Sequence, residues 1–257
     1  MMRILSCLAA LLLSLASVQA QESSRLDVIV KRGSLRVGLT GDYLPFSSFD
    51  KPTSTFRGFD VDMAEALGKA LGVKIEYVHT AWPQLTRDFE ADNFDIAMGG
   101  ISITLDRQKK GFFSTPIMRE GKTPIARCSD ADKYQTLAEI DKPSTRVIVN
   151  PGGTNERFAK ANIRSAEIRT YNDNVTIFEE IARGNADLMM TDASETRYQQ
   201  KLHPGVLCAV HPDKPFDFAE KAYWLQRDPA LKAFVDQWLH MAFEDGSYRK
   251  IYAAWFE

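Results

Sequence analysis

Apolar residues along this chain alternate between short continuous runs and longer stretches with helical spacing. Residues 35–39 and 74–78 have the short apolar pattern of buried strands. Between them, after Gly58, the apolar residues of positions 61–71 recur with the spacing of one helix face. A strand, a helix and a second strand in this order predict a right-handed crossover between parallel strands. We therefore expect an α/β fold with mostly parallel sheets flanked by helices.

Two later segments of the chain resemble each other. From Trp82 an amphipathic helix leads through a turn into the strand 94–98, and from Asn174 a second amphipathic helix leads into the strand 186–190. Both strands carry the pattern Asp, apolar residue, any residue, Met. A chance match remains an alternative, because helix-turn-strand units are common. We interpret the two segments as equivalent parts of two similar lobes.

The residues that follow these two strands are candidates for a ligand site. Ligands of open α/β sheets bind beyond the carboxyl ends of the strands. The first strand ends in residues 99–104, with Arg107 one turn further on. The second ends in Thr191-Asp192, with Glu195 one turn further on. We expect these two exits to face each other across a cleft between the lobes.

Asp192 and Glu195 are the most informative pair in the sequence. Two acids at this spacing share one face once a helix begins, so both should lie at the cleft. The same spacing forms a capping box, in which Asp192 accepts from the first helical amides and Glu195 reaches back to the N-cap amide. The spacing alone does not decide between a catalytic role and a capping role for these two acids.

The N-terminal segment has the pattern of an export signal. Arg3 precedes an apolar stretch at residues 4–18, and Val18-Gln19-Ala20 has the small residues that a signal peptidase recognises. The stretch is too short for a membrane span. We expect residues 1–20 to be a signal peptide cleaved after Ala20, leaving a soluble protein that is exported to the periplasm.

The balance of charged residues indicates which kind of partner the protein binds. The chain has 32 basic and 34 acidic residues, so no charge excess points to nucleic acid or to an anionic membrane. A small molecule is the expected ligand. The four histidines are scattered and indicate no metal site.

Once a signal peptide is removed, Cys128 and Cys208 remain, and in an oxidising compartment this pair indicates one disulfide.

Motifs over most of the chain resemble the extracellular solute-binding proteins of the polar amino acid type. The motifs are Gly41-Asp42-Tyr43 with Pro45-Phe46, Gly58-Phe59-Asp60-Val61-Asp62, Phe94-Asp95-Ile96, Ile101-Ser102-Ile103-Thr104 with Arg107, and Phe113-Ser114-Thr115-Pro116. The resemblance implies a two-lobed, periplasmic-binding-protein-like (type II) fold, with a mostly parallel sheet flanked by helices in each lobe and a ligand cleft between the lobes. We expect residues 21–124 and 215–257 to form lobe 1 and residues 125–214 to form lobe 2. A Cys128–Cys208 bond would then close most of lobe 2, away from the cleft.

A second set of motifs resembles the cyclohexadienyl dehydratases, periplasmic enzymes with this fold. The set comprises Gly121-Lys122-Thr123-Pro124, Val149-Asn150-Pro151-Gly152-Gly153-Thr154-Asn155-Glu156, Asp173-Asn174-Val175-Thr176-Ile177-Phe178, Leu188-Met189-Met190-Thr191-Asp192-Ala193 with Glu195, and Pro215-Phe216-Asp217-Phe218-Ala219-Glu220-Lys221-Ala222-Tyr223. The resemblance implies a carbon–oxygen lyase of phenylalanine biosynthesis, which converts prephenate to phenylpyruvate or arogenate to phenylalanine without a cofactor. The alternative is a non-catalytic amino-acid receptor of an ABC transporter.

The resemblance also implies roles for individual residues. Glu195 matches the general acid, and Lys122, Asn150 and Asn155 match other catalytic positions. Arg107 matches the arginine that holds a ligand carboxylate, and Asp192 matches the acid that takes an α-ammonium group. Further expected substrate-binding residues are Trp82, Tyr43, Asp42, Thr154, Ser102 and Thr104, with Trp82 and Tyr43 placed to sandwich the ring.

Three of these assignments have simpler alternatives. A lone lysine such as Lys122 is usually solvated, and Arg107 lies in a charged stretch typical of a surface. Residues 150–155 also have the pattern of an ordinary strand-to-helix turn with Asn as its cap.

Overall fold

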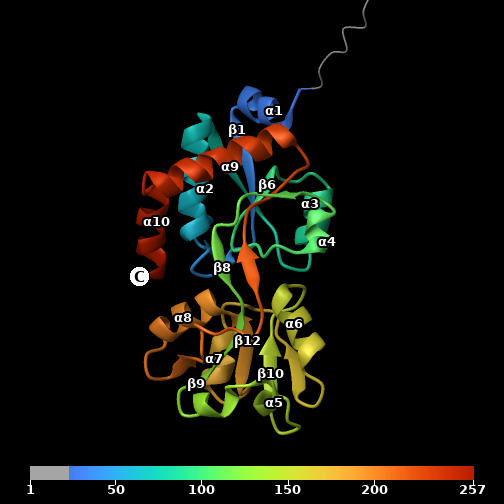
Figure 1. Ribbon diagram of the computed structural model, residues 1–257, viewed down its shortest axis with the longest axis vertical. Helices are drawn as coiled ribbons and strands as arrows, with labels where there is room; N and C mark the ends of the chain where they lie inside the picture. The colour runs from blue at the N-terminus through green and yellow to red at the C-terminus, as the bar shows by residue number, and fades with distance from the viewer. Residues whose placement is uncertain (1–22) are drawn as a thin grey trace, which may run out of the picture.

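The computed structural model describes residues 23–257, so the expected signal peptide and its cleavage site lie outside the described residues. Two lobes stand one above the other (Figure 1). The chain is in the upper lobe first, crosses to the lower lobe, and returns to finish in the upper lobe (Figure 1). None of the helices within residues 23–257 combines the length and apolar character that crossing a membrane requires.

Lobe 1 is built on a five-stranded sheet in the order β5-β1-β6-β15-β7. Strand β1 pairs in parallel with β5 and β6, and β15 runs antiparallel between β6 and β7. The strands are β1 (Ser34–Leu39), β5 (Lys74–His79), β6 (Ile96–Ala97), β7 (Phe112–Phe113) and β15 (Trp224–Leu225). The helices are α1 (Arg25–Arg32), α2 (Phe59–Leu71), α3 (Leu85–Glu90), α4 (Leu105–Gln108), α9 (Pro229–Glu244) and α10 (Ser247–Phe256).

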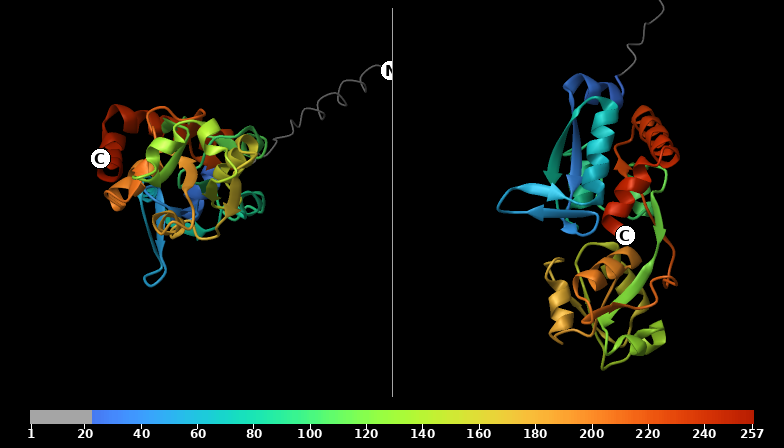
Figure 2. Two further views of the ribbon diagram at one scale, coloured as in Figure 1. Left: turned by 90° about the horizontal axis from the view of Figure 1, so that it is seen from below. Right: turned by 90° about the vertical axis from the view of Figure 1, so that its left-hand side faces the viewer.

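A small antiparallel sheet extends from lobe 1. It consists of β2 (Asp42–Tyr43), β3 (Ser47–Asp50) and β4 (Thr55–Arg57). Figure 2 shows it as a blue hairpin that projects from the body of the lobe. Its first strand lies at the cleft and carries two of the expected site residues, Asp42 and Tyr43.

Lobe 2 repeats the plan with a sheet in the order β11-β10-β12-β9-β13. Strand β10 pairs in parallel with β11 and β12, whereas β9 is antiparallel to β12 and β13. The strands are β9 (Lys122–Arg127), β10 (Arg146–Val149), β11 (Glu167–Thr170), β12 (Leu188–Asp192) and β13 (Leu207–Ala209). The helices are the 3-10 helix η1 (Ala131–Tyr134), α5 (Leu137–Ile140), α6 (Thr154–Asn162), α7 (Ile177–Ala182) and α8 (Ala193–Leu202).

Two antiparallel strands connect the lobes. Strand β8 (Met118–Glu120) carries the chain down from lobe 1, and β14 (Ala219–Lys221) carries it back beside β8. Strand β9 begins at Lys122, directly after β8, so the second sheet starts before the boundary expected at residue 124. Lobe 1 therefore takes its sheet from two separate parts of the chain, and β14 ends at the cleft with Lys221.

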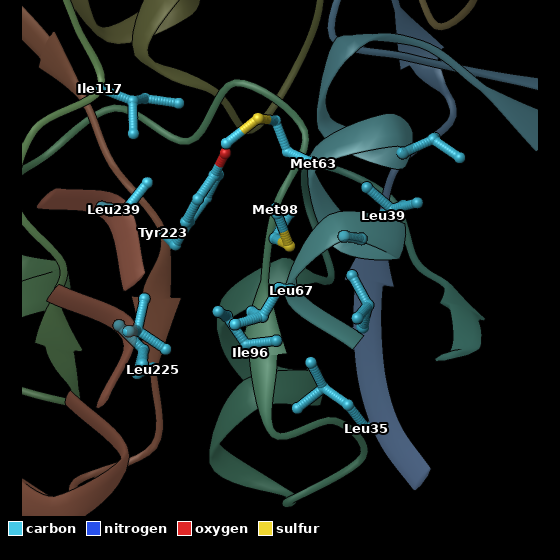
Figure 3. Packing of buried hydrophobic residues seen from close by; sticks show 14 of the residues in the cluster. Leu35, Leu39, Met63, Leu67, Ile96, Met98, Ile117, Tyr223, Leu225 and Leu239 are labelled. Atoms are coloured by element: carbon cyan, nitrogen blue, oxygen red, sulfur yellow. The ribbon is translucent and has the colours of Figure 1, made fainter. Parts of the chain in front are cut away.

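Each lobe has its own hydrophobic core. In lobe 1, Leu35 of β1, Leu67 of α2, Ile96 of β6 and Leu225 of β15 pack together (Figure 3). In lobe 2, a separate cluster forms around residues of β10 and β12, including Leu188. Each lobe has a second cluster as well, around Phe89 and Trp224 in lobe 1 and around Ile148 and Phe178 in lobe 2. Burial of apolar surface within each lobe leaves the cleft between them free for polar groups.

The internal similarity seen in the sequence corresponds to equivalent structure in the two lobes. In lobe 1, Asp95 at the start of β6 accepts from the backbone N–H (2.9 Å) and the guanidinium (2.9 Å) of Arg36. In lobe 2, Asp187 before β12 accepts from the backbone N–H (2.8 Å) and the guanidinium (2.6 Å) of Arg146. Each aspartate thereby ties its strand to the neighbouring parallel strand.

Cys128 and Cys208 form the expected disulfide. The two cysteines are separated by 80 positions, so the bond closes most of lobe 2. In the chain-entropy model, closing so long a loop stabilises the folded state by roughly 4 kcal/mol. Cys208 lies on β13, at the edge of the sheet, and neither cysteine is among the cleft-lining residues.

Candidate active site

A small cavity lies between the two lobes. Lobe 1 contributes Tyr43, Trp82, Gly100 and Ser102, lobe 2 contributes Asn150, Gly153, Thr154, Asn155 and Asp192, and β14 contributes Lys221. The free space has room for about one water molecule. The lobes are therefore closed upon each other, and polar side chains from both meet in the interior.

The strand exit of lobe 1 is held in place by Asp60. Gly99 and Gly100 follow β6 with φ values of 95° and 72°, a backbone region that favours glycine. Their two N–H groups donate to Asp60 Oδ2 (2.8 and 2.6 Å). Burial raises the pKa of Asp60 to about 6, against the two amide hydrogen bonds. Sequence reasoning gave Asp60 no role, although it lies in the quoted motif after Gly58.

Asp192 is the centre of the site. It lies opposite Lys122 in the antiparallel pairing of β12 and β9, and Lys122 Nζ donates to Asp192 Oδ1 (2.6 Å). Lys221 Nζ donates to Asp192 Oδ2 (2.7 Å), and so does the hydroxyl of Tyr43 (2.5 Å). Burial alone would raise the pKa of Asp192, but the two ammonium groups outweigh it and lower the pKa below its usual value. Asp192 is thus held as an anion.

Lys122 extends this network into lobe 2. Its ammonium also donates to Asn155 Oδ1 (2.5 Å) and to Thr154 Oγ1 (2.9 Å), both at the start of α6. The amide of Asn155 in turn donates to Asn150 Oδ1 (2.9 Å). Lys122 is therefore buried in a polar network, and it is not the solvated lysine of the simpler interpretation.

Glu195 has the opposite electrostatic environment from Asp192. Its side chain is 1% exposed, and Thr191 Oγ1 is its one hydrogen-bond partner among the described residues. Burial raises the pKa of Glu195 well above its usual value, and the negative charges of Asp192 and Asp42 act in the same direction. The Thr191 hydrogen bond and Lys122 oppose this shift without cancelling it. Glu195 is thus a buried carboxylic acid beside an anion.

The capping interpretation of this pair is wrong. Asp192 has the extended backbone of an N-cap residue, but its side chain accepts no amide of α8. Both of its oxygens are bound by lysines, and Glu195 points to Thr191 instead of back to the N-cap amide. The free α8 amide of Ser194 is satisfied by Glu120 (2.9 Å) from the crossover strand.

Arg107 and Thr104 are not among the residues that line the cavity. Arg107 is 5% exposed, which excludes the surface interpretation, and its Nη1 donates to the carbonyl of Ser102 (2.8 Å). Burial lowers the pKa of Arg107 to about 10, with Arg157 acting in the same direction. Thr104 accepts from the Arg107 amide (3.2 Å) as the N-cap of α4, so its expected contact with a substrate has a structural competitor.

Trp82 and Tyr43 do not form the two parallel walls expected for a ring. Their rings meet edge to face, with centroids 5.6 Å apart and an interplanar angle of 82°. Tyr43 instead stacks on the core residue Phe46 at 27°. Asp42 accepts from the indole of Trp82 (3.0 Å), and this bond orients the indole at the cleft.

Lys221 and Glu120 are site residues that sequence reasoning missed. Lys221 is 1% exposed, and its ammonium donates to Ser102 Oγ (2.9 Å) and lies 3.4 Å from Glu120 Oε1. The available signal was weak: Lys221 directly precedes the apolar run 222–225, where a buried charge is unusual. Its partners come from three distant parts of the chain, and no local pattern reveals them.

The fold and the site together define a two-lobed solute-binding protein with a cluster of charges at its cleft. Glu195 lies one turn from Asp192 and is not among the residues that line the cavity. The chain belongs to the bacterial extracellular solute-binding proteins, family 3, whose sequence profile matches residues 35–257, and within that family it groups with the cyclohexadienyl dehydratases. Membership of this family implies a periplasmic protein that binds a small molecule.

Three relatives support this placement. The chain is 57% identical over 253 residues to the cyclohexadienyl dehydratase of Pseudomonas aeruginosa, covering 98% of this chain and 92% of that one. It is 27% identical to the L-cystine-binding protein TcyJ of Escherichia coli, covering 90% and 85%. The crystal structure of an ancestral amino acid-binding protein described as a precursor of cyclohexadienyl dehydratase superimposes with a TM-score of 0.83 at 39% identity, covering 91% and 100%. The much higher identity to the dehydratase than to the two binding proteins supports the expected dehydratase over a receptor that only binds.

Proposed function

We propose that this protein catalyses the decarboxylating dehydration of prephenate to phenylpyruvate, of arogenate to phenylalanine, or of both, with Glu195 as the general acid. The observation that carries the proposal is the burial of Glu195 with a raised pKa, beside an Asp192 that is held as an anion. Two neighbouring acids with opposite protonation are the usual arrangement for acid catalysis near neutral pH. The 57% identity to a cyclohexadienyl dehydratase supports the same reaction.

The reaction needs one proton and a fixed ring. Each substrate is a cyclohexadiene with a carboxylate on one ring carbon and a hydroxyl on the opposite carbon. When the bond to the carboxylate breaks, carbon dioxide leaves and its electron pair enters the ring. The carbon–oxygen bond opposite then breaks, and the departing oxygen takes the proton of Glu195 and leaves as water. Glu195 regains a proton from solvent before the next turnover.

The remaining residues provide binding and orientation in this proposal. Lys122 and Arg107 are cations suited to the two carboxylates of the substrate, and guanidinium groups bind carboxylates in a bidentate manner. Asn150, Asn155 and Thr154 supply hydrogen bonds from lobe 2, while Tyr43, Ser102 and Trp82 face them from lobe 1. Because the closed cavity has room for about one water molecule, the lobes must separate to admit the substrate.

A receptor that only binds amino acids is the competing function. Such a receptor needs an acidic oxygen for the ammonium group of its ligand, and Asp192 is the expected acid. Both oxygens of Asp192 already accept from lysines in this structure, and the dehydration requires a protonated acid such as Glu195, whereas the binding of an amino acid does not. These two observations favour the enzyme.

The decisive experiment is a turnover assay with the purified mature protein, for which we propose a start at Gln21 after cleavage behind Ala20. The protein is incubated with prephenate, and the formation of phenylpyruvate is followed. We expect turnover by the unmodified protein and a kcat lower by about 10²- to 10⁴-fold for Glu195→Gln, because the variant lacks the transferable proton.

Glu244→Gln, an exchange at an exposed position of α9, is the matched control and should retain full activity. If Glu195→Gln keeps most of the activity, Glu195 is not the general acid. Tight binding of amino acids without any turnover by the unmodified protein would establish the receptor instead.

A further inference from the structure

Thr191 joins the proposed general acid Glu195 to the polar network of lobe 2. It lies on β12 and is 0% exposed, and its hydroxyl donates to Glu195 Oε2. The same hydroxyl oxygen accepts from Asn155 Nδ2 (3.0 Å). Asn155 lines the cavity, so Thr191 is the link between a cavity residue and the acid. The reaction as proposed above gives Thr191 no role.

The direction of the hydrogen bonds in this network is fixed by Lys122. An ammonium group carries donors only, so the atom of Asn155 that lies 2.5 Å from Lys122 Nζ is the carbonyl oxygen Oδ1. The amide nitrogen of Asn155 therefore donates, to Asn150 Oδ1 (2.9 Å) and to Thr191 Oγ1 (3.0 Å). Because Thr191 accepts from Asn155, its own hydrogen is left for Glu195.

The same reasoning decides which oxygen of Glu195 carries the proton. A hydroxyl has one hydrogen, and within residues 23–257 the partners of Thr191 Oγ1 are Asn155 and Glu195. If Glu195 Oε2 carried the proton and donated to Thr191, the Thr191 hydrogen would be buried without an acceptor, which is unfavourable. Oε2 therefore accepts. The proton lies on Oε1, which has no hydrogen-bond partner in the described part of the chain.

We propose that Thr191 is a positioning residue, which directs the proton of Glu195 to Oε1 and leaves that oxygen free to reach the departing hydroxyl of the substrate. This inference rests on the proposed function, because it concerns the acid of that reaction. Once the proton has been transferred, the Thr191 hydroxyl stabilises the carboxylate that remains. Thr191 acts through Glu195 and is not itself among the residues that line the cavity.

The other groups that act on Glu195 are unchanged when the Thr191 hydroxyl is removed. Its titratable neighbours are Asp192 of β12, Asp42 and Tyr43 of β2, and Lys122 of β9. Burial raises the pKa of Glu195, the two aspartates raise it further, and the lysine lowers it. The tyrosine stays neutral, since burial and the charge of Asp192 hold its pKa well above its usual value. The Thr191 hydrogen bond lowers the pKa of Glu195, so its loss should raise that pKa.

Two variants of Thr191 test the proposal in the turnover assay. Thr191→Val removes the hydroxyl at similar shape, and Thr191→Ser keeps it. We expect Thr191→Val to lower kcat for prephenate by about tenfold with little change in KM, because the acid is weaker and its proton is no longer directed. The fall of kcat at high pH should also move to higher pH, since the pKa of Glu195 rises. Thr191→Ser should restore both properties.

Thr123→Val is the matched control. Thr123 lies opposite Thr191 in the pairing of β9 and β12, is equally buried, and donates to the carbonyl of Val210. Thr123→Val should therefore lose stability but keep the pH profile of the unmodified protein. Circular dichroism and thermal melting establish that each variant is folded, and Thr191→Ala replaces Thr191→Val if the valine variant is not.

Infrared spectroscopy tests the direction of the hydrogen bond without any turnover. The carbonyl band of the protonated Glu195 is identified by its absence in Glu195→Gln. A carbonyl oxygen that accepts a hydrogen bond absorbs at lower frequency than a free one. Because Oε2 accepts from Thr191, the band should move to higher frequency in Thr191→Val, return in Thr191→Ser, and stay in place in Thr123→Val.

The outcomes separate this inference from the proposed function. An unshifted band in Thr191→Val, a missing Glu195 band, or a pH profile that Thr191→Ser does not restore overturns the inference, even where prephenate is turned over. If the unmodified protein turns over no prephenate, the proposed function fails. The infrared band then still decides whether Thr191 directs the proton of Glu195 to Oε1.

Discussion

Asp192 and Glu195 lie on one turn of the chain, yet their surroundings give them opposite protonation. Asp192 receives two ammonium groups and a hydroxyl, whereas Glu195 receives one hydroxyl and is otherwise enclosed. Their different pKa values thus follow from the number of charged partners, since both side chains are almost fully buried. The immediate partners of each carboxyl group therefore decide that Asp192 is the anion and Glu195 the acid.

The raised pKa of Glu195 predicts a measurable effect on stability. An acid whose pKa is higher in the folded state than its usual 4.5 stabilises the fold most below that value, and this contribution is lost as the pH rises through the folded pKa. Glu195→Gln removes the titrating group, so we expect its melting temperature to exceed that of the unmodified protein at pH 8. The gain should be roughly 2–4 °C for each kcal/mol recovered.

Thermal melts at about pH 4 and pH 8 test this expectation, because the difference should nearly vanish at the lower pH. Glu244→Gln should show no difference at either pH. A Glu195→Gln variant that melts lower than the unmodified protein at pH 8 would mean that Glu195 is stabilised there as an anion. The activity of the unmodified protein should also fall as the pH rises, since the acid must carry its proton.

At the scale of elements, the central strand of each lobe begins next to an aspartate that binds two arginines. Asp95 is 0% exposed and binds Arg32 and Arg36, while Asp187 is 8% exposed and binds Arg127 and Arg146. Each aspartate also accepts the N–H of the neighbouring strand. The lobes therefore share a charge cluster at equivalent places as well as a strand order.

The different burial of the two aspartates predicts different effects of one exchange. Asp95→Asn removes the charge of a fully buried carboxylate that pairs with Arg32 and Arg36, and we expect it to lower the free energy of unfolding by about 3 kcal/mol. Asp187→Asn should cost less, because the side chains of Asp187 and Arg146 are more exposed and solvent screens the lost charge. Urea denaturation of both variants measures the two values. Equal losses, or a greater loss for Asp187→Asn, would contradict this account.

At the scale of the whole molecule, the closed cleft depends on contacts between loops of opposite lobes. The amide of Asn174 in lobe 2 donates to the carbonyl of Asp42 in lobe 1 (2.9 Å). Gly152 in lobe 2 lies against Pro83 in lobe 1, where an added Cβ would come within 2.7 Å of the proline backbone. A larger residue at position 152 therefore obstructs closure without touching either core.

Two glycine exchanges separate obstruction of closure from backbone strain. Gly152 and Gly205 have similar φ values of 79° and 73°, but an added Cβ at Gly205 meets nothing within 4 Å. Gly152→Ala and Gly205→Ala should both lose about 1 kcal/mol of stability from the left-handed backbone. Gly152→Ala alone should lower kcat/KM for prephenate, by about tenfold or more, because it displaces the groups that must meet across the cleft. Equal kinetics in both variants would show that this contact plays no part in turnover.

Local patterns predicted the elements well and their ends less well. The helix after Gly58 was expected from its apolar spacing, and α2 covers residues 59–71. The strand expected at 94–98 is shorter, with β6 limited to Ile96–Ala97. Its length depends on the pairing with β1 and β15, and strands far along the chain determine that pairing.

The periodicity of the chain was enough to predict an α/β fold and a strand exit that carries Asp192 and Glu195, because it shows which faces are buried. Two similar lobes were an interpretation of the repeated segment, and the family resemblance implied the same two-lobed fold. The cysteine count was enough to expect the disulfide. Only the folded structure decided that Asp192 binds Lys122 and Lys221 instead of capping α8, and that Lys221 belongs to the site at all. These contacts join residues that are 70 and 29 positions apart, and a charge's partner depends on distance in space, which no local pattern contains.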